Sequence, residues 1–168
     1  LSYREVVKLF IGVLDAVQAL HECSIIHRDI KAANVLVTKD GTPKLIDLGL
    51  ARIEDINVTP LTKSNEIVGT VAYLPPEIVL GQPYTKASDI YQLAFALDLA
   101  IRGRDLQAKS AVKQNLDSTI DEIISKAMAR KPENRFPSVK SFKRALKDWL
   151  AGKRTKIHSL GQSNGQNR

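Results

Sequence analysis

Asn34 and Asp47 are two residues with oxygen-bearing side chains, and they flank the two strands of a predicted hairpin at its open end. Short β-forming runs at 35–37 and 45–46 flank Asp40-Gly41, a strong signal for a two-residue turn. If Asp40-Gly41 forms that turn, Asn34 faces Asp47 across the strand ends. A carboxylate and an amide oxygen held together in this way suit Mg²⁺, which prefers oxygen ligands. The alternative is that both residues are only turn formers at the ends of strands.

The segment just before Asn34 adds groups that can act on a phosphate. Residues 27–34 read His-Arg-Asp-Ile-Lys-Ala-Ala-Asn, which brings a carboxylate, an ammonium group and an amide close together in the chain. Asp29 could orient a hydroxyl nucleophile and accept its proton. Lys31 could neutralise charge on a phosphoryl group during transfer. Positioning and charge stabilisation are nearly all that phosphoryl transfer requires.

The elements that must position these residues are mainly helical. Apolar residues at three- and four-residue spacing over 2–22 predict an amphipathic helix capped by Ser2. Residues 52–76 lack a sustained period and predict a long loop. Residues 88–101 are apolar nearly all round, which predicts a buried helix with Ser88 as its N-cap. Two further helices are expected over residues 119–130 and 138–150. The predicted fold class is α+β, mainly α-helical with one small β-hairpin.

The order of these motifs resembles that of eukaryotic-type (Hanks-type) serine/threonine protein kinases. Residues 27–34 resemble the catalytic loop H-R-D-x-K-x-x-N, and Asp47-Leu48-Gly49 resembles the D-F-G motif with Leu for Phe. Gly69-Thr70 and Pro75-Pro76-Glu77 resemble the end of a kinase activation segment, with Pro for the Ala of A-P-E. The resemblance covers roughly residues 1–150 and implies the C-terminal lobe of the catalytic domain.

The resemblance implies a role for each residue of the first two motifs. Asp29 would be the catalytic base, and Lys31 would contact the γ-phosphate of ATP. Asn34 and Asp47 would bind Mg²⁺. The implied reaction transfers the γ-phosphoryl group of Mg-ATP to a Ser or Thr hydroxyl of a protein substrate.

Further matching positions would support the site. His27 and Leu48 would pack in an internal apolar stack. Arg135 would pair with Glu77, and Asp89 would begin the buried helix.

Specificity and regulation are also implied by single positions. Lys31 and Thr70 resemble residues of serine/threonine rather than tyrosine kinases. Arg28 resembles the arginine of kinases activated by phosphorylation of their activation loop, because a guanidinium group can bind a phosphate through two hydrogen bonds. The hydroxyls available for that modification are Thr59, Thr62 and Ser64.

One half of a kinase domain has no counterpart in these residues. The Gly-rich loop, the strand lysine and the helix glutamate of the N-terminal lobe are not recognisable. The N-lobe is therefore expected to be absent, and the chain alone is expected to be inactive. The alternative function is a non-catalytic, kinase-like protein-interaction module. A small-molecule phosphotransferase is a third possibility, against which the peptide-site motif at residues 69–77 weighs.

Composition limits the setting of the protein. The chain has 168 residues, 43% of them hydrophobic, and a formal net charge of +7. Residues 151–168 form a basic, polar tail that is expected to be disordered. The tail interleaves no aromatic residues, so nucleic-acid binding is not expected. The longest apolar run, residues 90–101, is too short for a membrane span. The single cysteine, Cys23, fits a reducing, cytoplasmic location, with a membrane anchor elsewhere left open.

Overall fold

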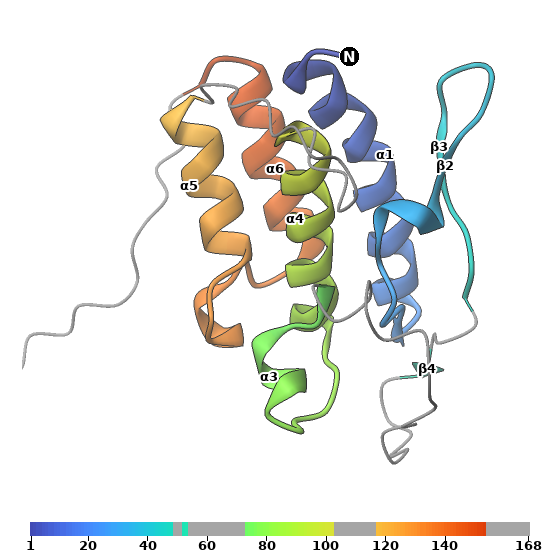
Figure 1. The fold of residues 1–168 in the computed structure, drawn as a ribbon, viewed down its shortest axis with the longest axis vertical. Helices are drawn as coiled ribbons and strands as arrows, with labels where there is room; N and C mark the ends of the chain where they lie inside the picture. Colours follow the sequence, from blue (N-terminus) through green and yellow to red (C-terminus); the bar gives the residue numbers. More distant parts are fainter. Residues whose placement is uncertain (49–51, 54–72, 103–116, 154–168) are drawn as a thin grey trace, which may run out of the picture.

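The helices of the chain lie roughly side by side, with a small hairpin standing along one of them (Figure 1). The computed structural model describes residues 1–48, 52–53, 73–102 and 117–153. Its α-helices are α1 (Tyr3–Glu22), α3 (Pro76–Val79), α4 (Lys86–Arg102), α5 (Ser118–Ala127) and α6 (Val139–Leu150). Its 3₁₀ helices are η1 (Ala32–Asn34) and η3 (Pro132–Asn134). Its strands are β1 (Ile25–Ile26), β2 (Val35–Val37), β3 (Pro43–Leu45) and β4 (Arg52–Ile53).

Helix α1 begins where the sequence predicts. Ser2 is its N-cap and Glu5 completes a capping box, with the Glu5 carboxylate accepting from the Ser2 backbone N–H at 2.7 Å. The two reciprocal bonds satisfy N–H groups that have no partner inside the helix. The apolar stripe predicted from the spacing faces the interior, where Phe10, Leu14 and Val17 are buried.

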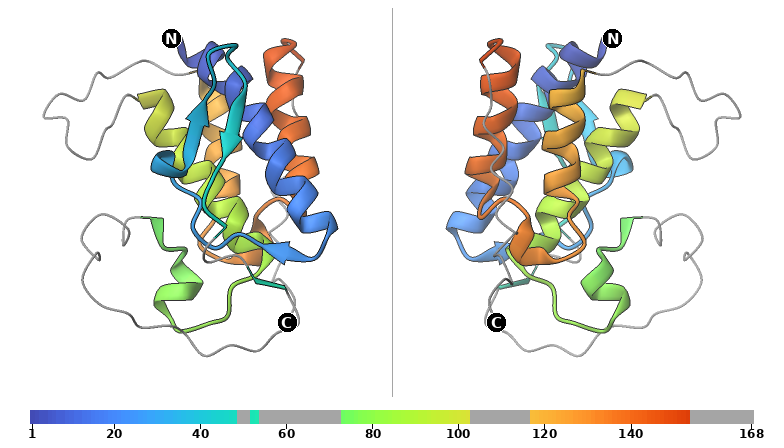
Figure 2. Two further views of the ribbon diagram at one scale, coloured as in Figure 1. Left: turned by 90° about the vertical axis from the view of Figure 1, so that its right-hand side faces the viewer. Right: turned by 90° about the vertical axis from the view of Figure 1, so that its left-hand side faces the viewer.

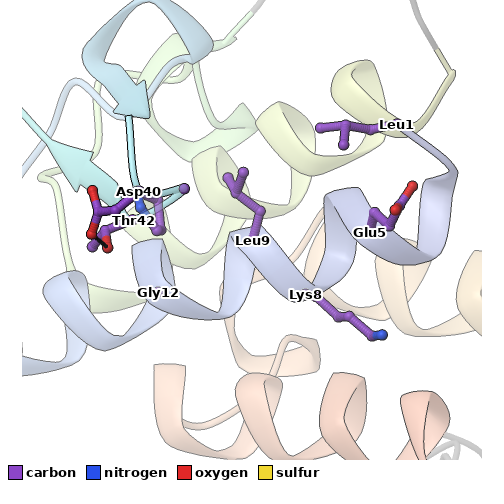
Figure 3. A pocket seen from close by; sticks show the side chains of 9 residues that line it. Leu1, Glu5, Lys8, Leu9, Gly12, Asp40 and Thr42 are labelled. Carbon is purple, nitrogen blue, oxygen red and sulfur yellow. Dashed lines mark hydrogen bonds between the residues drawn. The ribbon is translucent and has the colours of Figure 1, made fainter. Parts of the chain in front are cut away.

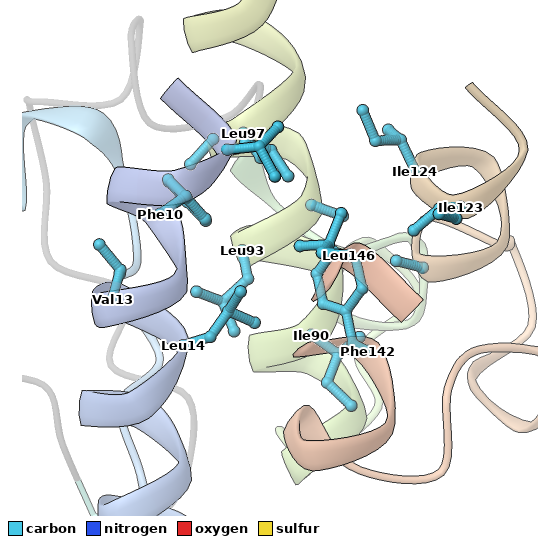
Figure 4. Packing of buried hydrophobic residues seen from close by; sticks show 14 of the residues in the cluster. Phe10, Val13, Leu14, Ile90, Leu93, Leu97, Ile123, Ile124, Phe142 and Leu146 are labelled. Atoms are coloured by element: carbon cyan, nitrogen blue, oxygen red, sulfur yellow. The ribbon is translucent and has the colours of Figure 1, made fainter. Parts of the chain in front are cut away.

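The core lies between α1, α4, α5 and α6. Figure 4 shows Phe10 and Leu14 of α1 directed toward Leu93 of α4, while Phe142 of α6 lies on the side of α5. Helix α4 is buried along most of its length, as its nearly continuous apolar sequence predicts. Figure 2 shows the hairpin in front of α1 and α4, on the side away from α5. In the described residues, no helix combines the length and the apolar character needed to cross a membrane.

The register of the hairpin differs from the prediction. Val35 pairs with Leu45, and Thr38 donates its N–H to the carbonyl of Thr42. The connection is therefore a three-residue loop that ends at Gly41, whose φ is 82°. A turn followed by a residue in the left-handed region is the usual three-residue solution, and only glycine enters that region without strain. As a result Asn34 lies opposite Ile46 and not opposite Asp47.

Two further expectations about the helices and loops are corrected. Helix α4 starts two residues before Ser88, so Ser88 is inside the first turn and is not the N-cap. Its hydroxyl accepts from the backbone N–H of Thr85 and donates to Glu77, bonds that hold the start of α4 against α3. The predicted loop at 52–76 contains a short strand, β4, which pairs antiparallel with β1. Most of that loop and residues 154–168 of the predicted tail lie outside the described residues.

Candidate active site

Three of the predicted site residues meet in the loop between β1 and β2. The carboxylate Oδ2 of Asp29 lies 2.9 Å from Nζ of Lys31. The Nδ2 group of Asn34 donates to the same Oδ2 at 3.1 Å and to the carbonyl oxygen of Asp29 at 2.8 Å. The side chain of Asp29 keeps 12% of its surface exposed and that of Lys31 keeps 27%. A base and a cation are thus brought together at a point that a substrate can reach.

Buried hydrogen bonds to α4 hold the backbone on which Asp29 stands. Asp89 has no exposed surface, and its carboxylate accepts the backbone N–H groups of His27 and Arg28, each at 2.9 Å. The same carboxylate lies 2.8 Å from Nε2 of His21, at the end of α1. Hydrogen bonds to a charged acceptor are stronger than neutral ones. The first turn of α4 therefore fixes the loop from one side.

Gln92, one turn further along α4, fixes the next part of the same loop. Its Oε1 accepts the N–H of Ile30 at 3.2 Å, and its Nε2 donates to the carbonyl of Arg28 at 3.1 Å. The backbone on both sides of Asp29 is thus bonded to α4.

Two residues of the site have unusual backbone conformations. Arg28 has φ 72° and Asp47 has φ 65°, both in the left-handed region that favours glycine. Each such residue costs about 1–3 kcal/mol and persists where the surroundings enforce it. The bonds from Asp89 and Gln92 supply that enforcement at Arg28, and they turn the chain so that Asp29 reaches Lys31 and Asn34.

His27 is buried beneath the loop, as the predicted apolar stack requires. Its Nδ1 accepts the N–H of Asp29 at 3.3 Å, and Nε2 has no hydrogen-bond partner among the described residues. Burial lowers the pKa of His27, while the nearby carboxylates of Asp89, Asp29 and Asp47 act in the opposite direction and do not overcome it. His27 is therefore neutral at pH 7, and its ring packs under the loop that carries Asp29.

Asp47 follows β3, next to the last bond of the hairpin. The N–H of Ile46 donates to the carbonyl of Asn34 at 2.8 Å, and Asp47 comes directly after it with an exposed side chain. The corrected register shifts Asp47 one position past Asn34, and the left-handed φ of Asp47 turns the chain there. Both Asn34 bonds to Asp29 use Nδ2, so its Oδ1 is directed away from Asp29. An amide oxygen and a carboxylate of this kind fit Mg²⁺ in ligand type.

Leu48 does not occupy the position that the resemblance implies. It is 54% exposed, so the prediction that it packs in an internal stack is wrong for the described residues. The chain turns at Asp47 and carries Leu48 away from the buried face of the hairpin.

Glu77 and Arg135 form the ion pair that the resemblance implies. Nη1 and Nη2 of Arg135 donate to the two carboxylate oxygens of Glu77 at 2.7 and 2.6 Å, and both residues are 3% exposed. Arg135 also donates to the carbonyl oxygens of Ala129 and Ala87. This ion pair joins α3, the start of α4 and the end of η3, and its two residues are far from Asp29 in the sequence.

Some predicted site residues lie outside the described part of the chain, and some residues near the site were not predicted. Thr70 and the candidate phosphorylation sites Thr59, Thr62 and Ser64 lie outside the described residues. Sequence reasoning missed His21 and Gln92; the polar side chain of Gln92 within an otherwise apolar helix was the signal that could have drawn attention to it. It also missed Tyr84, whose ring lies 5.9 Å from the Arg28 guanidinium and whose pKa burial raises to about 12.

Comparison with known proteins agrees with this geometry. The family model described as "Protein kinase domain" matches residues 1–160. The chain belongs to the protein kinase domain family.

Among similar proteins, a probable serine/threonine-protein kinase PknB of Bifidobacterium longum is 31% identical over 170 residues, covering 90% of this chain and 25% of that protein. Serine/threonine-protein kinase Pkn1 of Myxococcus xanthus is 33% identical over 168 residues, covering 87% of this chain and 24% of that protein. The chain thus spans about a quarter of the length of these relatives.

Proposed function

We propose that the chain is the C-terminal lobe of a serine/threonine protein kinase, which transfers the γ-phosphoryl group of Mg-ATP to a Ser or Thr hydroxyl of a protein. The observation that carries the proposal is the contact of the Asp29 carboxylate with Lys31 at 2.9 Å and Asn34 at 3.1 Å. The relatives named serine/threonine-protein kinases support the choice of acceptor.

The chemistry follows from the position of each group. The Oδ atoms of Asp29 accept a hydrogen bond from the acceptor hydroxyl, orient its oxygen toward the phosphorus and take its proton as the new bond forms. Lys31, held against Asp29, places a positive charge where the transferring oxygens carry negative charge. Oδ1 of Asn34 and the carboxylate of Asp47 would hold Mg²⁺. That ion, when bound, neutralises charge on the phosphates.

The assignment to one lobe rests on the exposed surface of the hairpin. Leu36, Val37 and Leu48 are 53%, 51% and 54% exposed, although all three are large and apolar. Leu36 and Val37 lie in β2, within three residues of Asn34, and Leu48 directly follows Asp47. Large apolar side chains that are exposed beside a candidate site suit contact with a ligand or with another part of a protein. A second lobe with the nucleotide between the lobes would cover this surface.

The test uses the full-length protein that contains this chain. Wild type and Asp29→Asn are incubated with Mg-ATP labelled at the γ-phosphate and a protein acceptor, and phosphoserine and phosphothreonine are measured. Loss of the general base is expected to lower the rate by about 10²–10⁴-fold. Asp15→Asn, a change to an exposed carboxylate on α1, is the matched control and should keep the wild-type rate. Equal rates for wild type and Asp29→Asn would refute the proposal. Nucleotide binding without any transfer would favour the interaction module.

A further inference from the structure

A glycine stands in the middle of α1, where it weakens the helix. Gly12 lies near the centre of the 20-residue helix, and glycine at such a place costs about 0.5–1 kcal/mol relative to alanine. The structure shows what the missing side chain permits. A Cβ atom at Gly12 would lie 2.5 Å from Cγ and 3.2 Å from Cδ of Pro43. Figure 3 shows the hairpin turn, with Asp40 and Thr42, lying directly over α1 at Gly12.

The contact cannot be relieved by rotating a side chain. Cγ and Cδ of Pro43 belong to a ring that is closed onto the backbone nitrogen of β3. A side chain at Gly12 would therefore push the strand itself. Pro43 pairs with Val37 and Leu45 pairs with Val35, so the two strands form one ladder and move together.

The same hairpin carries the predicted Mg²⁺ ligands. Asn34 directly precedes β2, and the bond from the N–H of Ile46 to the carbonyl of Asn34 extends the ladder by one step. Asp47 is the next residue. From Pro43 to Asp47 the chain advances four residues, about 13 Å in a strand. A displacement at Pro43 is thus transmitted along a short, paired segment to both oxygen ligands.

The two halves of the site consequently rest on different helices. Asp29 is anchored to α4 through Asp89 and Gln92, and the hairpin rests on α1 through Pro43 and Gly12. They meet at Asn34, whose Nδ2 reaches Asp29 at 2.8 and 3.1 Å. Hydrogen bonds of this kind are lost once the donor and acceptor separate beyond about 3.5 Å. Little displacement of the hairpin is needed to separate the two halves.

We propose that Gly12 is a positioning residue for the Mg²⁺-binding half of the site. The close contact of Pro43 with α1 at Gly12 fixes the hairpin that presents Asn34 and Asp47. The inference rests on the proposed function and adds to it the element that sets the metal ligands. A purely structural role for Gly12 would change the stability of the fold and leave metal affinity unchanged.

The experiment is a double-mutant cycle in the full-length protein. Mg²⁺ affinity is measured by calorimetric titration in the presence of saturating ADP, and the KM for a Ser/Thr peptide is measured separately. Gly12→Ala is expected to weaken Mg²⁺ binding by about tenfold, the usual effect of losing support behind a metal ligand. The peptide KM should stay within about twofold, because Asp29 keeps its own anchor on α4.

The second arm of the cycle removes the obstructing ring. Pro43→Ala removes the ring carbons Cγ and Cδ that the new methyl group of Gly12→Ala would meet, so the double variant should restore Mg²⁺ affinity to within about twofold of wild type. Pro43→Ala alone removes the contact between the Pro43 ring and α1, and it should therefore weaken Mg²⁺ binding. This variant keeps the test valid if Gly12→Ala does not fold. Lys8→Ala, an exposed change on α1 in the pocket that Gly12 and Pro43 also line, is the matched control and should have no effect.

The outcomes separate this inference from the proposed function. Unchanged Mg²⁺ affinity in Gly12→Ala, or a double variant as weak as the single one, would overturn the positioning role while the kinase assignment stands. A wild-type protein that binds no Mg-ADP would overturn the proposed function itself, and the role of Gly12 with it.

Discussion

Replacing Asp89 by asparagine should loosen the loop that carries Asp29 without changing any residue proposed to contact a substrate. The carboxylate accepts the backbone N–H groups of His27 and Arg28, and it also contacts His21. Asparagine offers one oxygen and one NH₂ group in the same volume. In either orientation, one of the two backbone N–H groups then faces another donor.

The size of the effect follows from these bonds. One hydrogen bond to a charged group, worth about 1.5–3 kcal/mol, is lost, and its buried donor is left unsatisfied. The surviving bond becomes a neutral one, worth about 1 kcal/mol. The lost restraint also releases Arg28, whose left-handed backbone is strained. We expect Asp89→Asn to lower the free energy of unfolding by about 3 kcal/mol, which for a chain of this size lowers Tm by about 6–12 °C.

Two measurements check this prediction. Thermal denaturation reports the loss of stability, and amide hydrogen exchange reports the protection of the His27 and Arg28 N–H groups. Exchange at these two amides should accelerate more than exchange at the amides of α1 or α4. Asp98→Asn is the matched control on the same helix, because its pair with Arg102 lies near the surface and is worth about 0.5 kcal/mol. A Tm loss no larger than that of the control, with His27 and Arg28 still protected, would refute the reasoning.

Two more predictions concern the ion pair of Glu77 and Arg135. Arg135→Leu leaves the Glu77 carboxylate buried at 3% exposure with Ser88 as its remaining side-chain partner, and should cost about 3–5 kcal/mol of stability in urea denaturation. The Glu77→Leu/Arg135→Leu double variant should recover part of the loss, and no recovery would show that the charge is not the cause. Burial raises the pKa of Glu77, but hydrogen bonds from Arg135, its own backbone and Ser88 outweigh this and hold it below its ordinary value of 4.5. The unfolded chain therefore binds the proton first, so this contribution to stability is present above about pH 4.5 and is lost as the pH falls through the lower, folded pKa. Unfolding free energies measured from pH 7 to pH 3 should show this loss in wild type and not in the double variant.

The proximity of three candidate site residues could be predicted because they lie in contiguous sequence. Asp29, Lys31 and Asn34 are within one loop, so their types and spacing already place them near one another, and the structure brings all three together. The start of α1 was predictable for the same reason, since the capping box of Ser2 and Glu5 depends on four consecutive residues.

The register of the hairpin could not be fixed by composition. Asp40-Gly41 favours a two-residue turn, yet the side chain of Asp40 accepts hydrogen bonds from the hydroxyls of Thr38 and Thr42 across the turn. These bonds suit a three-residue loop with Gly41 in the left-handed region. A shift of one residue was enough to move Asp47 from the position opposite Asn34 to the position after it.

The supports of the site were also beyond prediction from one sequence. Gly12 could be noticed as an isolated glycine within a helical pattern, but its partner Pro43 lies 31 positions later and follows a turn whose length was uncertain. His21 and Gln92 likewise act on residues far away in the chain. Pairings of this kind depend on how the helices pack, which the local pattern does not specify.

The bonds between Asp89 and the loop that carries Asp29 also bear on how the candidate site forms during synthesis. Asp89 follows His27 by 62 residues, so the ribosome completes the loop long before it makes the side chain that holds it. At about 5–20 residues per second, that interval lasts roughly 3–12 seconds. During this time the strained backbone at Arg28 has no acceptor to hold it, and Asp29 cannot keep its position beside Asn34. The arrangement of Asp29 and Asn34 can therefore form only after α4 has left the ribosome and docked against the loop.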